Sequence, residues 1–310
     1  MHRLLLVVAV LAVATSASAA PPATLRVYAH TGLRLADVVW NDGTFFFVQN
    51  TTNAVWREGK PPTLFASMPQ LVEETRCRTS PGAHGFPAGF LYCHAPDNVI
   101  YRIGSDGTVT VFARLPTTKT SDGALEFDTV GRFGYRLIAA TGRSGAPTPA
   151  GGTVYAIGSD GSVSTIGGYG GPGGADELVV APASFGAAAG QVVLAVDPGT
   201  KGGALVAMDA HGRTRRVATL PDGPNPIVVV PAHPQTGGKR GLYVTDTNSS
   251  NVFYAPASWL GAYGGSIVVG SEIKAFFWSV RPKGSAFAVR RIPLRLPGSG
   301  FNLEGAAYVR

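Results

Sequence analysis

The sequence of 310 residues is poor in charge, in cysteine and in long apolar runs. Charged side chains make up 15% of the chain, against about 25% in an ordinary soluble domain, whereas hydrophobic residues make up 45%. This combination argues against intrinsic disorder, because disordered chains are rich in charge and poor in apolar residues. Glycine (41 residues) and proline (23 residues) are abundant instead, and both are the poorest helix formers. The composition therefore predicts a turn-rich, all-β globular protein.

No apolar run reaches the roughly 20 residues that a helix needs to cross a bilayer. The run Leu4–Val13 follows Met1-His2-Arg3 and precedes Ala17-Ser18-Ala19, which is typical of a signal peptide and its cleavage site. We expect residues 1–19 to be a signal peptide and residues 20–310 to form a single domain. The expected protein is secreted or periplasmic and has no membrane span.

Cys77 and Cys93 are the only two cysteines. An even number of cysteines in an exported chain predicts one disulfide bond. The sequence contains no Cys-x-x-Cys and no His-Glu-x-x-His motif, so a zinc site is not expected. It also contains no Gly-x-Ser-x-Gly elbow, which argues against an α/β-hydrolase.

A short apolar-aromatic unit recurs through the chain at intervals of 45 to 54 residues. Its copies are 53–56, 98–101, 152–155, 203–206 and 251–254. Several copies run into a turn and a further strand, with Asp106-Gly107 and Asp160-Gly161 in two of these turns. Asp-Gly between alternating strands is typical of a hairpin, because glycine readily adopts the positive φ that the turn requires. Each repeat therefore predicts a small antiparallel meander.

A period of this length is typical of propeller blades. About 290 mature residues divided by a period of about 48 give six blades. The sequence thus predicts an all-β, six-bladed β-propeller of four-stranded antiparallel sheets. The segment Leu25–Ala29 resembles the outer strands of the repeats, so we expect it to complete the last blade. The segment from Ser266 to Arg310 does not follow the repeat, and its strand order stays unassigned.

The apolar strand Gly241–Thr247, the unit Asn251–Tyr254 and the Asp-Gly turns resemble the six-bladed propellers of the gluconolactonase-like and strictosidine-synthase-like superfamily. The resemblance implies innermost strands that begin with carboxylate or amide residues and hold one divalent cation, usually calcium, beside a substrate pocket. Calcium prefers six to eight oxygen ligands. The corresponding residues at the starts of the candidate innermost strands are Asp37, Asp122, Asp176, Asn225 and Glu304. A second interpretation is that these side chains only cap or solubilise the strand ends.

Two functions from different classes fit this sequence. In the first, the protein is a metal-assisted hydrolase of a lactone or small ester, in which the cation polarises the carbonyl and Asp176 or Asp122 activates water. His94, near a predicted strand end, is a further candidate general base. In the second, the protein is a non-catalytic propeller that binds a small molecule, a glycan or a partner protein. The sequence leaves open whether the protein is an enzyme.

The formal net charge of the chain is +7. Its basic residues are scattered, except for a local group at 281–295 that consists of Arg281, Lys283, Arg290, Arg291 and Arg295. A positive surface can attract nucleic acid or another polyanion. A solvated face explains this group more simply, and we expect no nucleic-acid partner.

Overall fold

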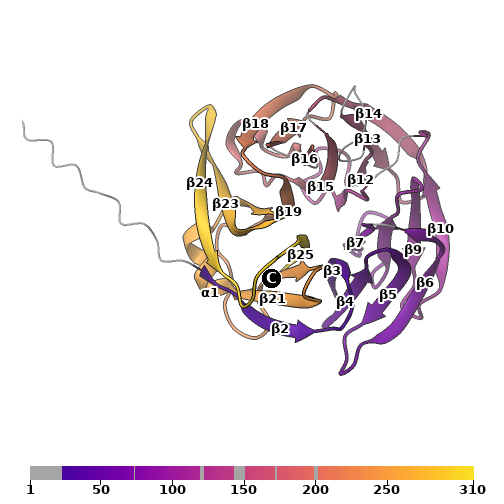
Figure 1. Ribbon diagram of the computed structural model, residues 1–310. Helices are drawn as coiled ribbons and strands as arrows, with labels where there is room; N and C mark the ends of the chain where they lie inside the picture. The colour runs from indigo at the N-terminus through magenta and orange to yellow at the C-terminus, as the bar shows by residue number, and fades with distance from the viewer. Residues whose placement is uncertain (1–22, 73, 119–121, 143–150, 172, 199–201) are drawn as a thin grey trace, which may run out of the picture.

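The chain folds into a six-bladed β-propeller. The computed structural model describes residues 23–72, 74–118, 122–142, 151–171, 173–198 and 202–310. Its strands form six sheets arranged around a central channel (Figure 1). The fold class predicted from the repeats is confirmed, whereas the expected signal peptide at residues 1–19 lies outside the described residues.

Blades 1 to 4 are each built from four consecutive strands, and the first strand of each is innermost. Blade 1 consists of β3 (Leu35–Asn41), β4 (Thr44–Gln49), β5 (Thr52–Arg57) and β6 (Thr63–Val72). Blade 2 consists of β7 (Arg76–Thr79), β8 (Leu91–His94), β9 (Val99–Ile103) and β10 (Val109–Arg114). Blade 3 consists of β11 (Leu125–Phe127), β12 (Leu137–Ala140), β13 (Gly152–Ile157) and β14 (Val163–Tyr169). Blade 4 consists of β15 (Gly174–Val180), β16 (Val192–Asp197), β17 (Gly203–Met208) and β18 (Thr214–Leu220), with η1 (Gly186–Ala188) between β15 and β16.

The last two blades are interleaved in the sequence. Blade 5 consists of β19 (Pro224–Val229), β22 (Ile267–Ser271), β23 (Lys274–Lys283) and β24 (Ala286–Arg295). Blade 6 consists of β25 (Leu303–Val309), β20 (Gly241–Asp246), β21 (Asn251–Pro256) and β2 (Arg26–His30). The chain thus leaves blade 5 after β19, forms the β20–β21 hairpin of blade 6, and returns through α1 (Ala257–Leu260) and η2 (Gly261–Tyr263). This exchange explains why the segment after Ser266 does not follow the repeat.

The N-terminal segment closes the ring. β2 pairs antiparallel with β21 and forms the outer strand of blade 6, as expected for Leu25–Ala29. The two-residue strand β1 (Ala23–Thr24) pairs in parallel with β24 and adds a fifth strand to blade 5. Blade 6 therefore takes its outer strand from the beginning of the chain and its innermost strand from the end, with β1 holding the same segment to blade 5.

The recurring apolar-aromatic units occupy the third strand of their blades, as the repeat predicts: β5, β9, β13, β17 and β21. The Asp-Gly turns join third strands to outer strands. In one of them Gly107 has φ +83°, and the Asp106 carboxylate accepts a hydrogen bond from the backbone N–H of Thr108 at 2.9 Å. Apolar side chains fill the space between neighbouring blades; between blades 1 and 2, for example, Val39 and Phe46 lie in one buried cluster with Leu91 and Tyr101.

The predicted disulfide bond is confirmed. Cys77 on β7 lies directly opposite Cys93 on β8, with a Cα–Cα distance of 4.0 Å. Both residues are fully buried between blades 1 and 2. The bond therefore joins the innermost strand of blade 2 to its neighbour. In the described part of the chain, no helix has the length and apolar character required to cross a bilayer.

Candidate functional site

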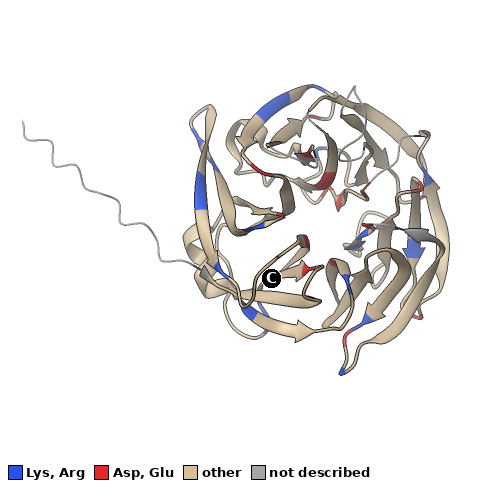
Figure 2. Ribbon diagram, viewed as in Figure 1, with Lys and Arg blue, Asp and Glu red and all other residues tan. Residues whose placement is uncertain are grey.

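Segments that carry charged residues lie around the centre of the ring (Figure 2). Two of them, Arg76 and Arg78, come from β7. Alternate residues of a strand face the same side, and these two arginines both reach acidic groups of other blades, whereas Cys77 between them faces the apolar cluster of blades 1 and 2. The innermost strand of blade 2 therefore supplies two cations to the channel.

Arg76 is fully buried and lies among groups from three other blades. Its Nη2 lies 3.1 Å from Glu304 Oε2 of blade 6, and its Nε lies 3.6 Å from Glu177 Oε1 of blade 4. Its Nη1 donates to the Ala36 carbonyl of blade 1. Burial alone would lower the pKa of Arg76, but the charges of Glu304 and Glu177 outweigh it and raise that pKa. Arg76 therefore carries a permanent positive charge that links four blades.

Arg78 continues the network along the channel. Its guanidinium lies 3.0 Å from Asp37, 3.3 Å from Glu126 and 3.5 Å from Glu177. The Arg78 side chain is 12% exposed, whereas those of Asp37 and Glu177 are 0% exposed. Two arginines and four carboxylates from five blades thus close the channel with one ion-pair network.

Two of the five expected metal ligands, Asp37 and Glu304, bind protein donors through both oxygens. Asp37 accepts hydrogen bonds from the backbone N–H groups of Val38 and Cys77, besides Arg78. Glu304 accepts from Arg76 and from Asn225 Nδ2 through Oε2, and from Asn302 Nδ2 through Oε1. The arginines therefore supply the positive charge that compensates these two carboxylates.

Asp37 and Glu304 approach closely because Gly305 lies between them. A Cβ at position 305 would lie 2.3 Å from Asp37 Oδ1 and 2.5 Å from its Cα. Only glycine lets β25 lie this close to β3. The glycine that follows Glu304 is therefore a packing requirement of the network.

Three other expected ligands, Asp122, Asp176 and Asn225, are buried near the starts of β11, β15 and β19. Burial raises the pKa of Asp176 well above its usual range, and the charges of Asp122, Asp197 and Glu74 raise it further. Asp176 Oδ1 and Asn225 Oδ1 are buried and accept no hydrogen bond from the described residues. Within the same described residues, no three His, Cys, Asp or Glu side chains are grouped so as to hold a metal ion.

His94 lies in the interior of blade 2 and is fully buried. Its Nδ1 lies 3.2 Å from the Ala124 carbonyl, which can only accept a hydrogen bond, so Nδ1 carries the hydrogen and donates. Burial lowers the pKa of His94 to about 4. A neutral, enclosed imidazole with this hydrogen bond favours a role in joining blades 2 and 3 over that of a general base.

Two further carboxyl groups have pKa values that are raised to near neutral pH. Burial raises the pKa of Glu177 to about 7 against the opposing charges of Arg78 and Arg76. Burial also raises the pKa of Glu272 to about 7, together with the charge and hydrogen bond of Asp197. Both groups therefore hold a proton in the folded protein at a pH at which an unfolded chain has lost it.

The free energy of unfolding is expected to fall as the pH rises from about 5 to about 7.5. Over this range the folded protein binds more protons than the unfolded chain, so each such carboxyl lowers stability by up to about 1.4 kcal/mol per pH unit. Denaturant unfolding measured across this range tests the prediction. Glu177→Gln should flatten the slope, and Asp160→Asn in an exposed turn should not. A stability that rises with pH over this range would contradict these pKa shifts.

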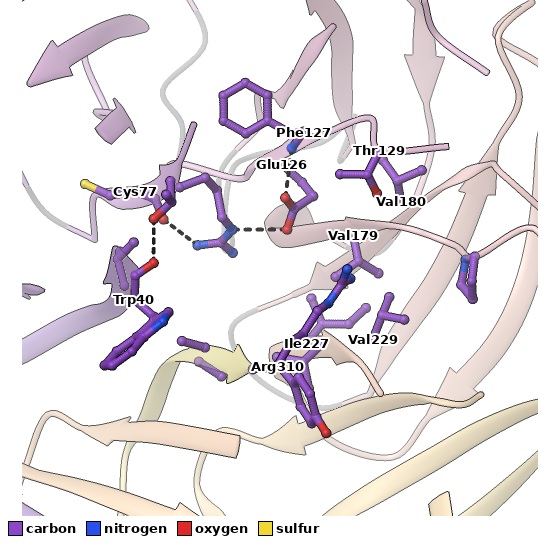
Figure 3. Close-up of a pocket in the computed structure, with 18 of the residues that line it drawn as sticks. Trp40, Cys77, Glu126, Phe127, Thr129, Val179, Val180, Ile227, Val229 and Arg310 are labelled. Carbon is purple, nitrogen blue, oxygen red and sulfur yellow. Dashed lines mark hydrogen bonds and ion pairs between the residues drawn. The ribbon is translucent and has the colours of Figure 1, made fainter. Parts of the chain in front are cut away.

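A cavity of about 560 Å³ lies next to the arginine network, toward the carboxyl ends of the innermost strands. Later residues of all six innermost strands line it, so these strands run in the same direction along the channel. Its walls are largely apolar, with Val179, Ile227 and Val229 among them, and Trp40, Glu126 and Arg310 add an aromatic ring and charges (Figure 3). Arg78 forms part of its inner end. The channel thus contains a pocket that the ion-pair network closes at one end.

Part of the pocket wall is a loop held by a buried carboxylate. Thr129 and Val130 of this loop line the pocket. Asp128 Oδ1 accepts from the N–H groups of Val130 and Gly131, and Oδ2 from those of Phe133 and Tyr135. Four backbone hydrogen bonds to one carboxylate fix the loop between β11 and β12, so this side of the pocket is pre-formed.

Sequence reasoning found acidic and amide residues at the starts of five innermost strands but missed the arginines of the sixth. Oxygen ligands for a cation come from acidic and amide side chains, whereas β7 begins with an arginine. The alternation Arg76-Cys77-Arg78 was the available signal, because a strand whose middle residue is buried places its two neighbours on the opposite face.

Comparisons with known proteins add no argument to the fold assignment. No protein-family model and no curated protein matches the chain. Among solved structures, the chain is similar to a protein from Bacteroides uniformis that is provisionally assigned as a 6-phosphogluconolactonase (12% identity, TM-score 0.38, covering 60% of this chain and 55% of that one). It is also similar to a protein of unknown function from Bacteroides thetaiotaomicron (13% identity, TM-score 0.43, covering 84% of this chain and 60% of that one). A third similar structure is that of a computationally designed protein (9% identity, TM-score 0.45, covering 89% of this chain and 65% of that one). The chain spans less than two thirds of the length of each, and the propeller assignment rests on the strand order.

Proposed function

We propose that this propeller binds a small organic molecule in the channel pocket. The observation that carries the proposal is the pocket of about 560 Å³, which has apolar walls and ends at the Arg76–Arg78 network. Binding sites for small molecules are typically concave, mostly apolar cavities of about 300–1,000 Å³ with a few placed polar groups. The pocket has these properties without any rearrangement of the blades.

The charged groups of the pocket indicate the class of ligand. The carboxylate of Glu126 is already engaged by Arg78 Nε and by the backbone N–H of Phe127. Arg78 in turn faces three carboxylates. Arg310, whose charge also acts on Glu126, is the second and more exposed lining cation, and it is the one we assign to a ligand group. A molecule with an apolar body and one anionic group fits this arrangement, with its body against the valine and isoleucine walls.

Filling the pocket should abolish binding of an anionic apolar probe. Ala183 lines the pocket, and Ala183→Trp would place a large ring there. We expect wild-type protein to bind 8-anilinonaphthalene-1-sulfonate, with the fluorescence increase reduced at least about tenfold in the variant. Ala187→Trp provides the matched control, because Ala187 is exposed and is not among the lining residues. Equal fluorescence from both variants would overturn the proposed site.

A metal-assisted lactone or ester hydrolase is the second candidate. The unengaged buried oxygens of Asp176 and Asn225, beside Asp122, favour it, because carboxylate and amide oxygens are the ligands that calcium prefers. A bound cation there would polarise a substrate carbonyl. Asp122 and Asp176 remain the candidate bases of this reaction. Asp37 and Glu304 fit such a site less well, since protein donors already engage both of their oxygens.

Calcium is expected to raise the melting temperature of wild-type protein near pH 7.5 if this second candidate is correct. Asp176→Asn should remove the shift, because it removes a charge from the acidic group, and Asp160→Asn in an exposed turn should retain it. The companion measurement is hydrolysis of a lactone and of a nitrophenyl ester with and without chelator. A calcium response that survives in Asp176→Asn, or the absence of any response, would exclude this site.

Export to an oxidising compartment remains part of the proposal. The Cys77–Cys93 disulfide supports it, because such bonds persist mainly in secreted and periplasmic proteins.

A further inference from the structure

The two signs of charge are distributed differently between the interior and the surface. The chain has 19 acidic residues, and nine of those that the structure describes are buried: Asp37, Asp122, Asp128, Asp176, Glu177, Asp197, Asp222, Asp246 and Glu304. Among the described basic residues, only Arg76 is buried. Many red segments accordingly lie around the centre of the ring, where the arginines of β7 also lie, and blue segments are prominent on the outer strands (Figure 2). The outer surface is therefore more positive than the formal net charge of +7 implies.

Exposed arginines concentrate on the outer strands of blades 4 and 5. We call this surface the arginine rim and define it by Arg213, Arg215, Arg216, Arg290, Arg291 and Arg295, all of which are exposed. β18 and β24, which carry five of them, contain no acidic residue. Among the residues that the structure describes, Arg213 is the one rim arginine that forms an ion pair, with Asp209 at 2.9 Å.

The arginines of the two blades belong to one continuous surface. Strands β18 and β24 lie in contact. Arg215 reaches from blade 4 to the β23–β24 turn of blade 5, where its Nη2 lies 3.3 Å from the Ser285 carbonyl and its guanidinium lies 5.6 Å from the centre of the Phe287 ring. This contact fixes the two strands next to each other, so a long ligand can touch both.

We propose that the arginine rim binds an acidic polysaccharide. Arginine forms paired hydrogen bonds with carboxylate and sulfate groups more effectively than lysine, and all six rim cations are arginines. A series of cations along the rigid outer strands suits a polymer that carries one anionic group per one or two sugar units. This site lies on the outer strands, apart from the residues that line the channel pocket.

The side chains around the rim favour a polysaccharide over nucleic acid or a membrane. Single-stranded nucleic acids stack their bases on exposed aromatic rings, but Arg291 covers Phe276 at 4.1 Å and Arg215 covers Phe287. Insertion into a membrane interface needs exposed large apolar groups. On β18 and β24 the only exposed large hydrophobic residue is Val289. Charge and hydrogen bonding are thus the interactions that the rim offers.

Two triple variants with equal net charge test this proposal. Arg216→Gln/Arg290→Gln/Arg291→Gln removes three rim charges, and Arg57→Gln/Arg114→Gln/Arg132→Gln removes three exposed charges from blades 1 to 3. We expect wild-type protein to bind dextran sulfate or polygalacturonate, and a comparison of the two polymers distinguishes sulfate from carboxylate recognition. The rim variant should lose affinity about tenfold or more at constant salt, and the control variant less than about threefold. Melting temperatures of both variants verify that they are folded.

Three results would overturn the proposal. Equal losses in the two variants would show that only the overall charge matters. Absence of binding to both polymers at about 50 mM salt, where exposed charges are weakly screened, would remove the site. Tighter binding to single-stranded DNA or to anionic phospholipid vesicles than to either polysaccharide, reduced by the same rim variant, would assign the rim to a different partner.

Discussion

Replacing Arg76 with methionine is expected to destabilise the protein by about 3–5 kcal/mol, because removal of one partner from a buried ion pair leaves the other charges uncompensated. Glu304 loses its arginine partner, and Glu177 loses one of its two arginine partners and keeps Arg78. For a chain of this size the melting temperature should fall by on the order of 10 °C. Chemical denaturation near pH 7.5 measures the effect, and Arg132→Met at an exposed position is the matched control.

A variant that fails to fold still leaves this prediction testable. Adding Glu304→Gln to Arg76→Met removes one of the stranded charges and should restore part of the lost stability. The difference between Arg76→Met and wild type should also shrink near pH 5, since raised pKa values let Glu177 and Glu304 take up protons there. A destabilisation of less than about 1 kcal/mol at pH 7.5 would show that Arg76 does not hold these carboxylates.

Removing the disulfide is the second large effect that we expect. Cys77→Ala/Cys93→Ala opens a loop with a sequence separation of 16 residues, and a loop of this length predicts a loss of about 3 kcal/mol through the entropy of the unfolded chain. The cavities left by two fully buried sulfur atoms add to that loss. Unfolding of wild-type protein with and without reductant gives the same comparison without mutation.

The disulfide should also affect the pocket, because Cys77 lies between the two channel arginines and its N–H donates to Asp37. We expect the double alanine variant to bind the naphthalene sulfonate probe more weakly than wild type even where both are folded. Equal unfolding midpoints for the oxidised and reduced protein would contradict the stabilising role of the bond.

The sequence predicted the blades because the strands of most blades follow one another directly in the chain. A unit such as Asn98–Tyr101, its Asp106-Gly107 turn and the following strand are adjacent in the chain, so periodicity and turn chemistry identify them. The pairing of β19 with β22 has no such signal, because the β20–β21 hairpin separates the two strands. Long-range strand exchange of this kind depends on packing between blades and not on local pattern.

The candidate site was predictable to a similar extent. Acidic and amide residues that precede apolar strands, such as Asp176 and Asn225, indicated buried polar groups, and the structure buries them. Which group compensates each carboxylate was not predictable, because that depends on the partners that other blades supply. Asp37 and Glu304 face arginines of β7, a strand that sequence analysis had not assigned to the channel.

The most direct test of the channel assignment is a crystal structure of the protein with 8-anilinonaphthalene-1-sulfonate. The account predicts the naphthalene ring against Val179 and Ile227, the sulfonate near Arg310, and an intact Arg76–Glu304 ion pair that separates the ligand from Asp176. A ligand at Asp122 and Asp176, or a channel that is open through the position of Arg76, would contradict it.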